Sequence, residues 1–70
     1  MNKESKCFYP RIRSIRLRLG YSQDFIASRL GIKQTAYSRY ERGASEFPIK
    51  HLIVLSRLYG VSIDFMVGND

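Results

Sequence analysis

Apolar residues recur along most of the chain at spacings of three and four, the period expected of helices that bury one face. No stretch shows the strict apolar and polar alternation that is typical of a half-buried strand. Glycine and proline interrupt the pattern at short intervals. The sequence therefore predicts an all-α fold, a compact bundle of five short helices.

The first helix is expected to begin near Pro10, because proline suits the first helical turn, and to end at Gly20. Leu17 falls outside its apolar stripe. The residues on that stripe are Phe8, Ile12, Ile15 and Leu19. Residues 1–7 show no periodic pattern, so we expect a flexible N-terminal arm followed by a single domain over residues 8–70.

The second helix is expected to follow the capping residue Ser22, to cover Gln23–Leu30 and to end at Gly31. Phe25 lies beside its inward face and is expected to be partly exposed. The inward positions are Ile26, Ala27 and Leu30. A third helix, Gln34–Arg42, ends at the next glycine. Its residues facing the core are Tyr37 and Tyr40.

The fourth helix is expected to open at Pro48 and to end at Gly60. Its shared face consists of Ile49, Leu52, Leu55, Ser56 and Tyr59. Ser62 then caps a short fifth helix that ends at Val67. Near this helix, the residues available for the core are Val61, Phe65 and Met66.

The net charge of the chain narrows the classes of partner that it is expected to bind. Twelve Lys and Arg residues against six Asp and Glu residues give a formal net charge of +6, which attracts polyanions such as nucleic acid or anionic lipid. No apolar run approaches the roughly 20 residues of a membrane span, and residues 1–7 show no signal-peptide pattern. We therefore expect nucleic acid as the partner, no membrane association and a cytoplasmic location.

The sequence offers little support for a metal site or a catalytic site. Cys7 is the only cysteine, so no internal disulfide can form, and it has no Cys or His at the spacing of a zinc site. His51 has no evident catalytic partner and is expected to be a surface histidine. No phosphate-binding glycine loop or nucleophile elbow is present. We therefore expect no metal, no cofactor and a protein that is not an enzyme.

The second and third helices have the layout of a helix-turn-helix, two short helices joined by a glycine turn. Ala27 stands where the helices would cross closely and a small side chain is needed. Gly31, four residues later, can adopt the left-handed conformation of a sharp turn. The positions that would hold the helices at a fixed angle are Ile26, Leu30, Ile32, Tyr37 and Tyr40.

Several segments resemble the phage-repressor/Cro (Xre-type) family of bacterial helix-turn-helix transcriptional regulators. They are Gly20-Tyr21-Ser22-Gln23, Ile26-Ala27, Leu30-Gly31-Ile32, Tyr37-Ser38-Arg39-Tyr40-Glu41-Arg42-Gly43 and Tyr59-Gly60-Val61-Ser62-Ile63-Asp64. Phe25 departs from the acidic or polar residue usual in the family, and Lys33 from a small hydroxyl cap. The resemblance implies a sequence-specific regulator of double-stranded DNA, expected to be a repressor, that inserts Gln34–Arg42 in the major groove.

The resemblance implies that the third helix reads bases, and the chemistry of its residues agrees. Gln34 can bond adenine N6 and N7, Thr35 offers a hydroxyl and a methyl group, and Arg39 suits guanine or a phosphate. Ala36 can contact a thymine methyl group. The residues expected to bind phosphate are Gln23, Lys33, Ser38 and Arg42. For Arg42 and the arginines of the first helix, exposure to solvent without DNA contact stays open.

Glu41 is an acid near a DNA-binding surface, where an unpaired negative charge would weaken binding. The resemblance implies that it pairs with Arg16 of the first helix. The alternative is two separately solvated charges.

A homodimer on DNA is expected, because one recognition helix reads only a few base pairs. The candidate contacts between copies are Val54, Leu58, Ile63 and Val67. The alternative is that these side chains pack within the domain. A function from another class also stays open, a small protein-binding module such as an antitoxin or anti-repressor.

Overall fold

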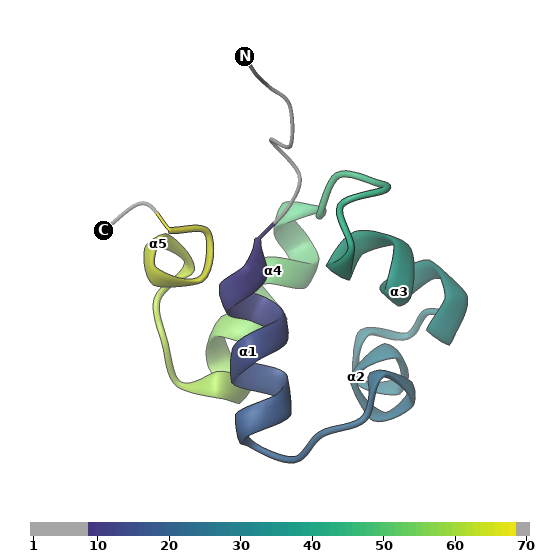
Figure 1. The fold of residues 1–70 in the computed structure, drawn as a ribbon, viewed down its shortest axis with the longest axis horizontal. Helices are drawn as coiled ribbons and strands as arrows, with labels where there is room; N and C mark the ends of the chain where they lie inside the picture. Colours follow the sequence, from purple (N-terminus) through teal and green to yellow (C-terminus); the bar gives the residue numbers. More distant parts are fainter. Residues whose placement is uncertain (1–8, 69–70) are drawn as a thin grey trace.

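The computed structural model describes residues 9–68, which form five α-helices and no strand (Figure 1). The helices are α1 (Pro10–Arg18), α2 (Gln23–Leu30), α3 (Gln34–Glu41), α4 (Ile49–Tyr59) and α5 (Ile63–Met66). The predicted all-α class and the order of five helices are confirmed. The expected arm over residues 1–7, together with Cys7 and Phe8, lies outside the described residues.

Capping residues and glycines set the helix ends within one or two residues of the predicted positions. The Ser22 hydroxyl accepts a hydrogen bond from the Phe25 amide, and Ser62 accepts one from the Phe65 amide, both at 3.0 Å. Gly31 ends α2 in the left-handed region at φ 72°. These local signals act within a few residues, so they fix where each helix starts and stops.

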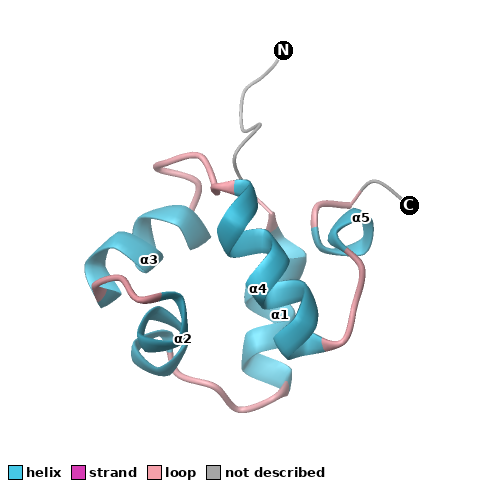
Figure 2. Ribbon diagram, turned by 180° about the vertical axis from the view of Figure 1, so that it is seen from behind, coloured by secondary structure: helices cyan, strands magenta, loops and turns pink. Residues whose placement is uncertain are grey.

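The helices α1 and α4 lie in the middle of the molecule, with α1 in front in Figure 1 and α4 in front when it is seen from behind in Figure 2. On one side of them α2 packs against α3, and on the other side α5 packs against α1 and α4. The core that joins these helices consists of Ile12, Ile15, Ile26, Ala27, Tyr37, Phe47, Leu52, Leu55, Tyr59 and Met66. This arrangement places α2 and α3 together at one end of the molecule.

The expected buried face of α4 is corrected by the structure. Ile49 is 62% exposed, whereas His51, expected at the surface, is only 7% exposed. The His51 ring lies 5.8 Å from the ring of Tyr40, so the buried face of α4 includes this histidine. Burial, with a smaller effect of Lys50, lowers the pKa of His51.

Two further core predictions are wrong. Leu19 is 48% exposed because α1 ends at Arg18 and the chain turns before another helix covers it. Phe65 is 37% exposed, and the Arg11 guanidinium covers its ring at 4.6 Å from the centroid, while Met66 fills the core. Leu17 and Phe25 are exposed as predicted.

Candidate nucleic-acid interface

The turn between α2 and α3 has the geometry of a helix-turn-helix. The Gly31 amide donates to the Ser28 carbonyl at 3.1 Å, and the Ile32 amide donates to the Ala27 carbonyl at 3.0 Å. Ala27 is 1% exposed, so its small side chain lies buried in the core at this turn. Lys33 precedes α3 without a side-chain capping bond, as expected from its lack of a short hydroxyl group.

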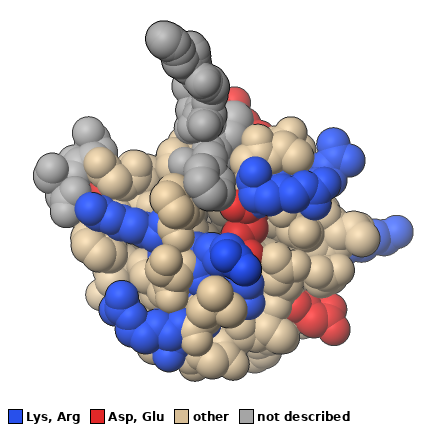
Figure 3. Space-filling model, viewed as in Figure 1, with Lys and Arg blue, Asp and Glu red and all other residues tan. Residues whose placement is uncertain are grey.

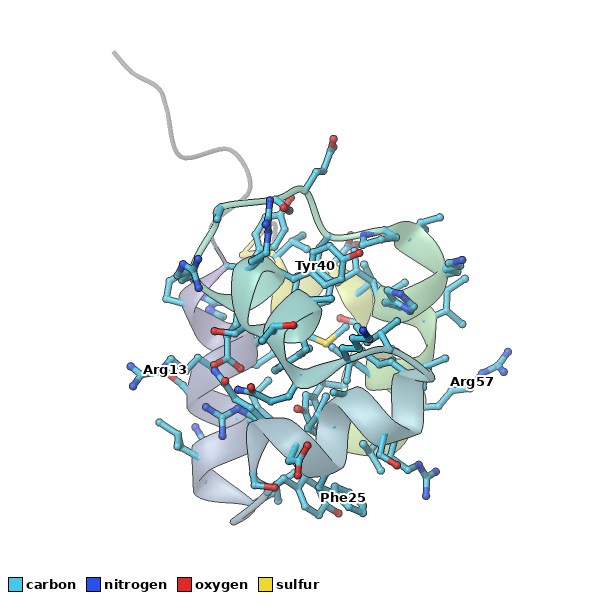
Figure 4. All side chains as sticks on the ribbon, turned by 90° about the vertical axis from the view of Figure 1, so that its right-hand side faces the viewer. Arg13, Phe25, Tyr40 and Arg57 are labelled. Atoms are coloured by element: carbon cyan, nitrogen blue, oxygen red, sulfur yellow. The ribbon has the colours of Figure 1, made fainter. Side chains whose placement is uncertain are left out.

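The outward face of α3 carries the side chains predicted to read bases. Gln34, Thr35 and Arg39 are exposed, and Ala36 is half-buried. Figure 4 looks onto the side of the molecule formed by α2 and α3, with Tyr40 of α3 near the middle and Arg13 at one edge. The structure therefore presents the predicted base-reading residues together on one accessible helix.

A hollow of about 560 Å³ lies beside α3. It is lined by Ile32, Lys33, Thr35, Ala36, Arg39, Tyr40 and Ser45. Lys33 and Arg39 contribute positive charge to this hollow, and the backbone after α3 contributes Ser45. The hollow brings one predicted phosphate-binding residue beside three predicted base readers.

A second hollow of about 290 Å³ is lined by Arg13, Gln23, Ser38, Glu41 and Arg42. Three of these residues were predicted to bind phosphate, and the Arg42 Nη1 donates to the Ser38 Oγ at 3.3 Å. Arg13 of α1 joins them; the sequence left both phosphate contact and simple solvent exposure open for the arginines of this helix. Figure 3 shows Lys and Arg side chains across the α1 face of the molecule, with acidic atoms visible between them.

Glu41 is buried at the centre of a polar network. Arg16 Nε donates to Glu41 Oε2 at 2.8 Å, and Arg16 Nη2 donates to Oε1 at 3.0 Å. The Tyr37 hydroxyl donates to Oε2 at 2.6 Å, and Gln23 Nε2 donates to Oε1 at 2.8 Å. The ion pair is thus bidentate and buried, and the two charges are not separately solvated.

The network keeps Glu41 ionised. Burial alone would raise the pKa of Glu41, but hydrogen bonds from Arg16, Tyr37 and Gln23 outweigh burial, and the pKa is lowered. The hydrogen bond to Glu41 raises the pKa of Arg16, and burial raises the pKa of Tyr37. The acid is therefore neutralised by its partner, which reduces its repulsion of a polyanion.

The same network extends to the first residue of α3. Gln34 Nε2 donates to Gln23 Oε1 at 2.6 Å, and Gln23 Nε2 donates in turn to Glu41. Gln23 thus uses one of its two N–H groups and its amide oxygen inside the protein, where it orients Gln34. One amide N–H and the amide oxygen of Gln34 stay available for a ligand.

The predicted dimer contacts are half-buried rather than exposed. Leu58, Ile63 and Val67 pack partly against the core. Val54 is half-buried on α4, and its neighbour Ile53 is 38% exposed. Each of the predicted dimer contacts is therefore partly buried within the domain and partly accessible to solvent.

Comparison with known proteins decides the family. A sequence model of a helix-turn-helix family matches residues 12–66. The chain is also 42% identical over 60 residues to the SPbeta prophage-derived HTH-type transcriptional regulator YonR of Bacillus subtilis, covering 86% of this chain and 56% of the relative. The chain belongs to the Cro/repressor (Xre-type) family of helix-turn-helix regulators.

Other members of the Cro/repressor family also match this chain. The HTH-type transcriptional regulator ImmR of Bacillus subtilis is 37% identical over 60 residues, which cover 86% of this chain and 47% of the relative. The chain spans about half the length of these relatives. The P22 c2 repressor protein, solved in complex with a synthetic operator, matches with a TM-score of 0.76 and 26% identity, covering 99% of this chain and 100% of that chain.

The Cro/repressor family consists of DNA-binding regulators rather than enzymes. Within residues 9–68, no cluster of His, Cys, Asp or Glu is arranged to hold a metal ion. None of the helices in that range is long and apolar enough to span a bilayer.

Proposed function

We propose that this chain is a sequence-specific regulator of transcription that acts as a repressor by inserting the Gln34–Arg42 segment into the major groove of operator DNA. The observation that carries the proposal is the outward face of α3, on which Gln34, Thr35 and Arg39 are exposed beside a hollow that contains the basic residues Lys33 and Arg39. Binding to operator DNA in the related P22 repressor structure supports it. A cytoplasmic location, where such DNA is accessible, is part of the proposal.

Base reading is assigned to Gln34, Thr35, Ala36 and Arg39. The bond from Gln34 to Gln23 leaves one N–H and the oxygen of the Gln34 amide, the pair that adenine N7 and N6 require. Because the Gln34 side chain is already held, less rotamer freedom is lost on binding. Thr35 and Ala36 offer methyl groups for thymine.

Phosphate contacts are assigned to Lys33, Ser38, Arg42 and the remaining N–H of Gln23, with Arg13 added from the structure. Arg13 Nε lies 3.9 Å from Glu41 Oε1, and its side chain is 62% exposed. A phosphate in this hollow would meet Arg13 and Arg42, which line it together with the neutralised acid. These contacts fix the register of the protein on DNA without reading its sequence.

Lys33→Ala is expected to weaken binding to all duplexes by a similar factor. Lys33 is exposed at the start of α3, and removing one phosphate contact releases one fewer counterion. The slope of log affinity against log salt is expected to fall by about 1. Titrations of a fluorescent duplex at several salt concentrations measure the slope, with Lys50→Ala on α4 as the control. An unchanged slope would remove Lys33 from the interface.

A homodimer on DNA is the second part of the proposal. Its candidate contacts are Val54 and Leu58 of α4 together with Ile63 and Val67, all of them half-buried, and Ile53 of α4 is 38% exposed. Two copies related by a two-fold axis would place identical patches against each other and two recognition helices on half-sites about 34 Å apart.

The dimer is tested by charge substitution at Val54 and Leu58. A Val54→Glu, Leu58→Glu variant is expected to bind the selected duplex as a single copy, because buried charges between identical patches repel. Sedimentation with and without DNA measures the stoichiometry. Since Leu58 also packs on the core, Val54→Glu alone is a second variant, and Leu17→Glu on α1 is the control. Variants that fold and still bind in pairs would contradict this interface.

A protein partner is the second candidate function, and one observation favours it. Phe25 is 39% exposed and stacks on Tyr21 with ring centroids 4.9 Å apart. Exposed aromatic residues are enriched at protein interfaces. Affinity for duplex DNA that neither falls with salt nor depends on sequence would favour this function over DNA reading.

A further inference from the structure

The chain after α3 folds back onto the recognition helix. Gly43, at φ 83°, adopts the left-handed conformation that this reversal requires. Its amide donates to the Tyr40 carbonyl at 3.2 Å, and the Ala44 amide donates to the Arg39 carbonyl at 2.8 Å. These two bonds form a Schellman motif. The Ser45 amide donates to the same Arg39 carbonyl at 3.3 Å, so the backbone of Ser45 is held beside Arg39.

The side chains of these two residues also meet. Arg39 Nε donates to Ser45 Oγ at 3.4 Å, and both residues line the larger hollow beside α3. This bond engages Nε and leaves the terminal amino groups Nη1 and Nη2 for an outside acceptor pair. The guanidinium is exposed, so in the absence of Ser45 little else in the hollow would select its orientation.

We propose that Ser45 is a specificity-determining positioning residue, which holds the Arg39 guanidinium so that Nη1 and Nη2 meet O6 and N7 of one guanine. This inference rests on the proposed function. An unrestrained arginine at the same place can turn toward a neighbouring phosphate, which carries no sequence information. By limiting these alternatives before binding, Ser45 favours base reading over simple charge attraction.

The test uses the duplex that the intact chain selects from a random pool. The guanine read by Arg39 is first located as the base pair where Arg39→Ala loses its preference. Ser45→Ala is then expected to lower affinity for the selected duplex by about 2- to 10-fold, the effect of one hydrogen bond, with affinity for random duplex unchanged. Ser45→Thr keeps the hydroxyl group and is expected to retain the wild-type affinity. Ser28→Ala, an exposed serine of α2, is the matched control.

A chemical probe separates positioning from direct contact. Replacing that guanine with 7-deazaguanine removes the N7 acceptor, and the loss of affinity is expected to be smaller for Ser45→Ala than for the wild type. In an Arg39→Ala background, Ser45→Ala is expected to have no further effect on the selected duplex. Equal losses on selected and random duplexes, or losses that add to that of Arg39→Ala, would overturn this inference alone. A wild-type chain without sequence preference would overturn the proposed function together with it.

Discussion

Arg16→Ala is expected to lower the free energy of unfolding by about 3–5 kcal/mol, because it leaves the Glu41 carboxylate buried without its counter-charge. Glu41 is 3% exposed and Arg16 is 6% exposed, so the pair lies in the interior, where an unpaired charge is costly. A domain of this length has a total stability of about 3–10 kcal/mol. Much of the variant should therefore be unfolded at room temperature. Urea denaturation followed by circular dichroism measures the change.

The control for this substitution is Arg18→Ala, at the exposed end of the same helix. Its effect is expected to stay within about 0.5 kcal/mol. Replacing both members of the pair, as Arg16→Met with Glu41→Leu, is expected to recover much of the stability that the single change removes. A loss from Arg16→Ala no greater than that from Arg18→Ala would show that the pair does not hold α1 to α3.

The acid dependence of stability follows from the same pair. The folded protein lowers the pKa of Glu41 below its ordinary value of 4.5, so the carboxylate stabilises the fold above that pH. This stabilisation is lost as the pH falls from that value through the folded-state pKa. Glu41→Gln removes the titrating group, so its stability should vary less over the same acid range than that of the wild type.

Arg39→Ala and Gln34→Ala are each expected to cost about 1–3 kcal/mol on the selected duplex and to relax the preference at one base pair. The cost arises because each side chain offers a pair of hydrogen-bonding groups that only one base matches in the major groove. Competition binding against duplexes that differ at single positions measures both the loss and its location.

Gln23→Ala provides a further comparison, since it removes the bond that orients Gln34 without removing the base reader itself. It is expected to relax the preference at the same base pair as Gln34→Ala. If Arg39→Ala and Gln34→Ala lose affinity equally on selected and random duplexes, both residues are phosphate contacts rather than base readers.

Local signals made the helix ends of this fold predictable from the sequence. Ser22 and Ser62 cap helices through bonds to amides three residues away, and Gly31 ends α2, so each acts within one short segment. The exposed face of α3 was predictable for a related reason. Its helical period separates Tyr37, which is buried, from Arg39, which is exposed.

Contacts between distant segments were not predictable from the pattern. Gln23 bonds Glu41 across 18 residues, and Arg13 enters the same hollow from another helix. The burial of His51 depends on the ring of Tyr40, and Phe47 enters the core from a segment that has no helical period. The pairing of Arg16 with Glu41 was expected only from the family resemblance, because spacing alone left both charges free to be solvated.

Selection of duplexes from a random pool by the intact chain tests the central claim most directly. The account predicts enrichment of one sequence, with affinity for it well above that for random DNA and with both affinities falling as salt rises. It also predicts that Arg39→Ala, given the same pool, loses the preference for guanine at one position of the half-site. Recovery of a pool as random as the starting one, under conditions where the chain is folded, would contradict sequence-specific DNA reading by α3.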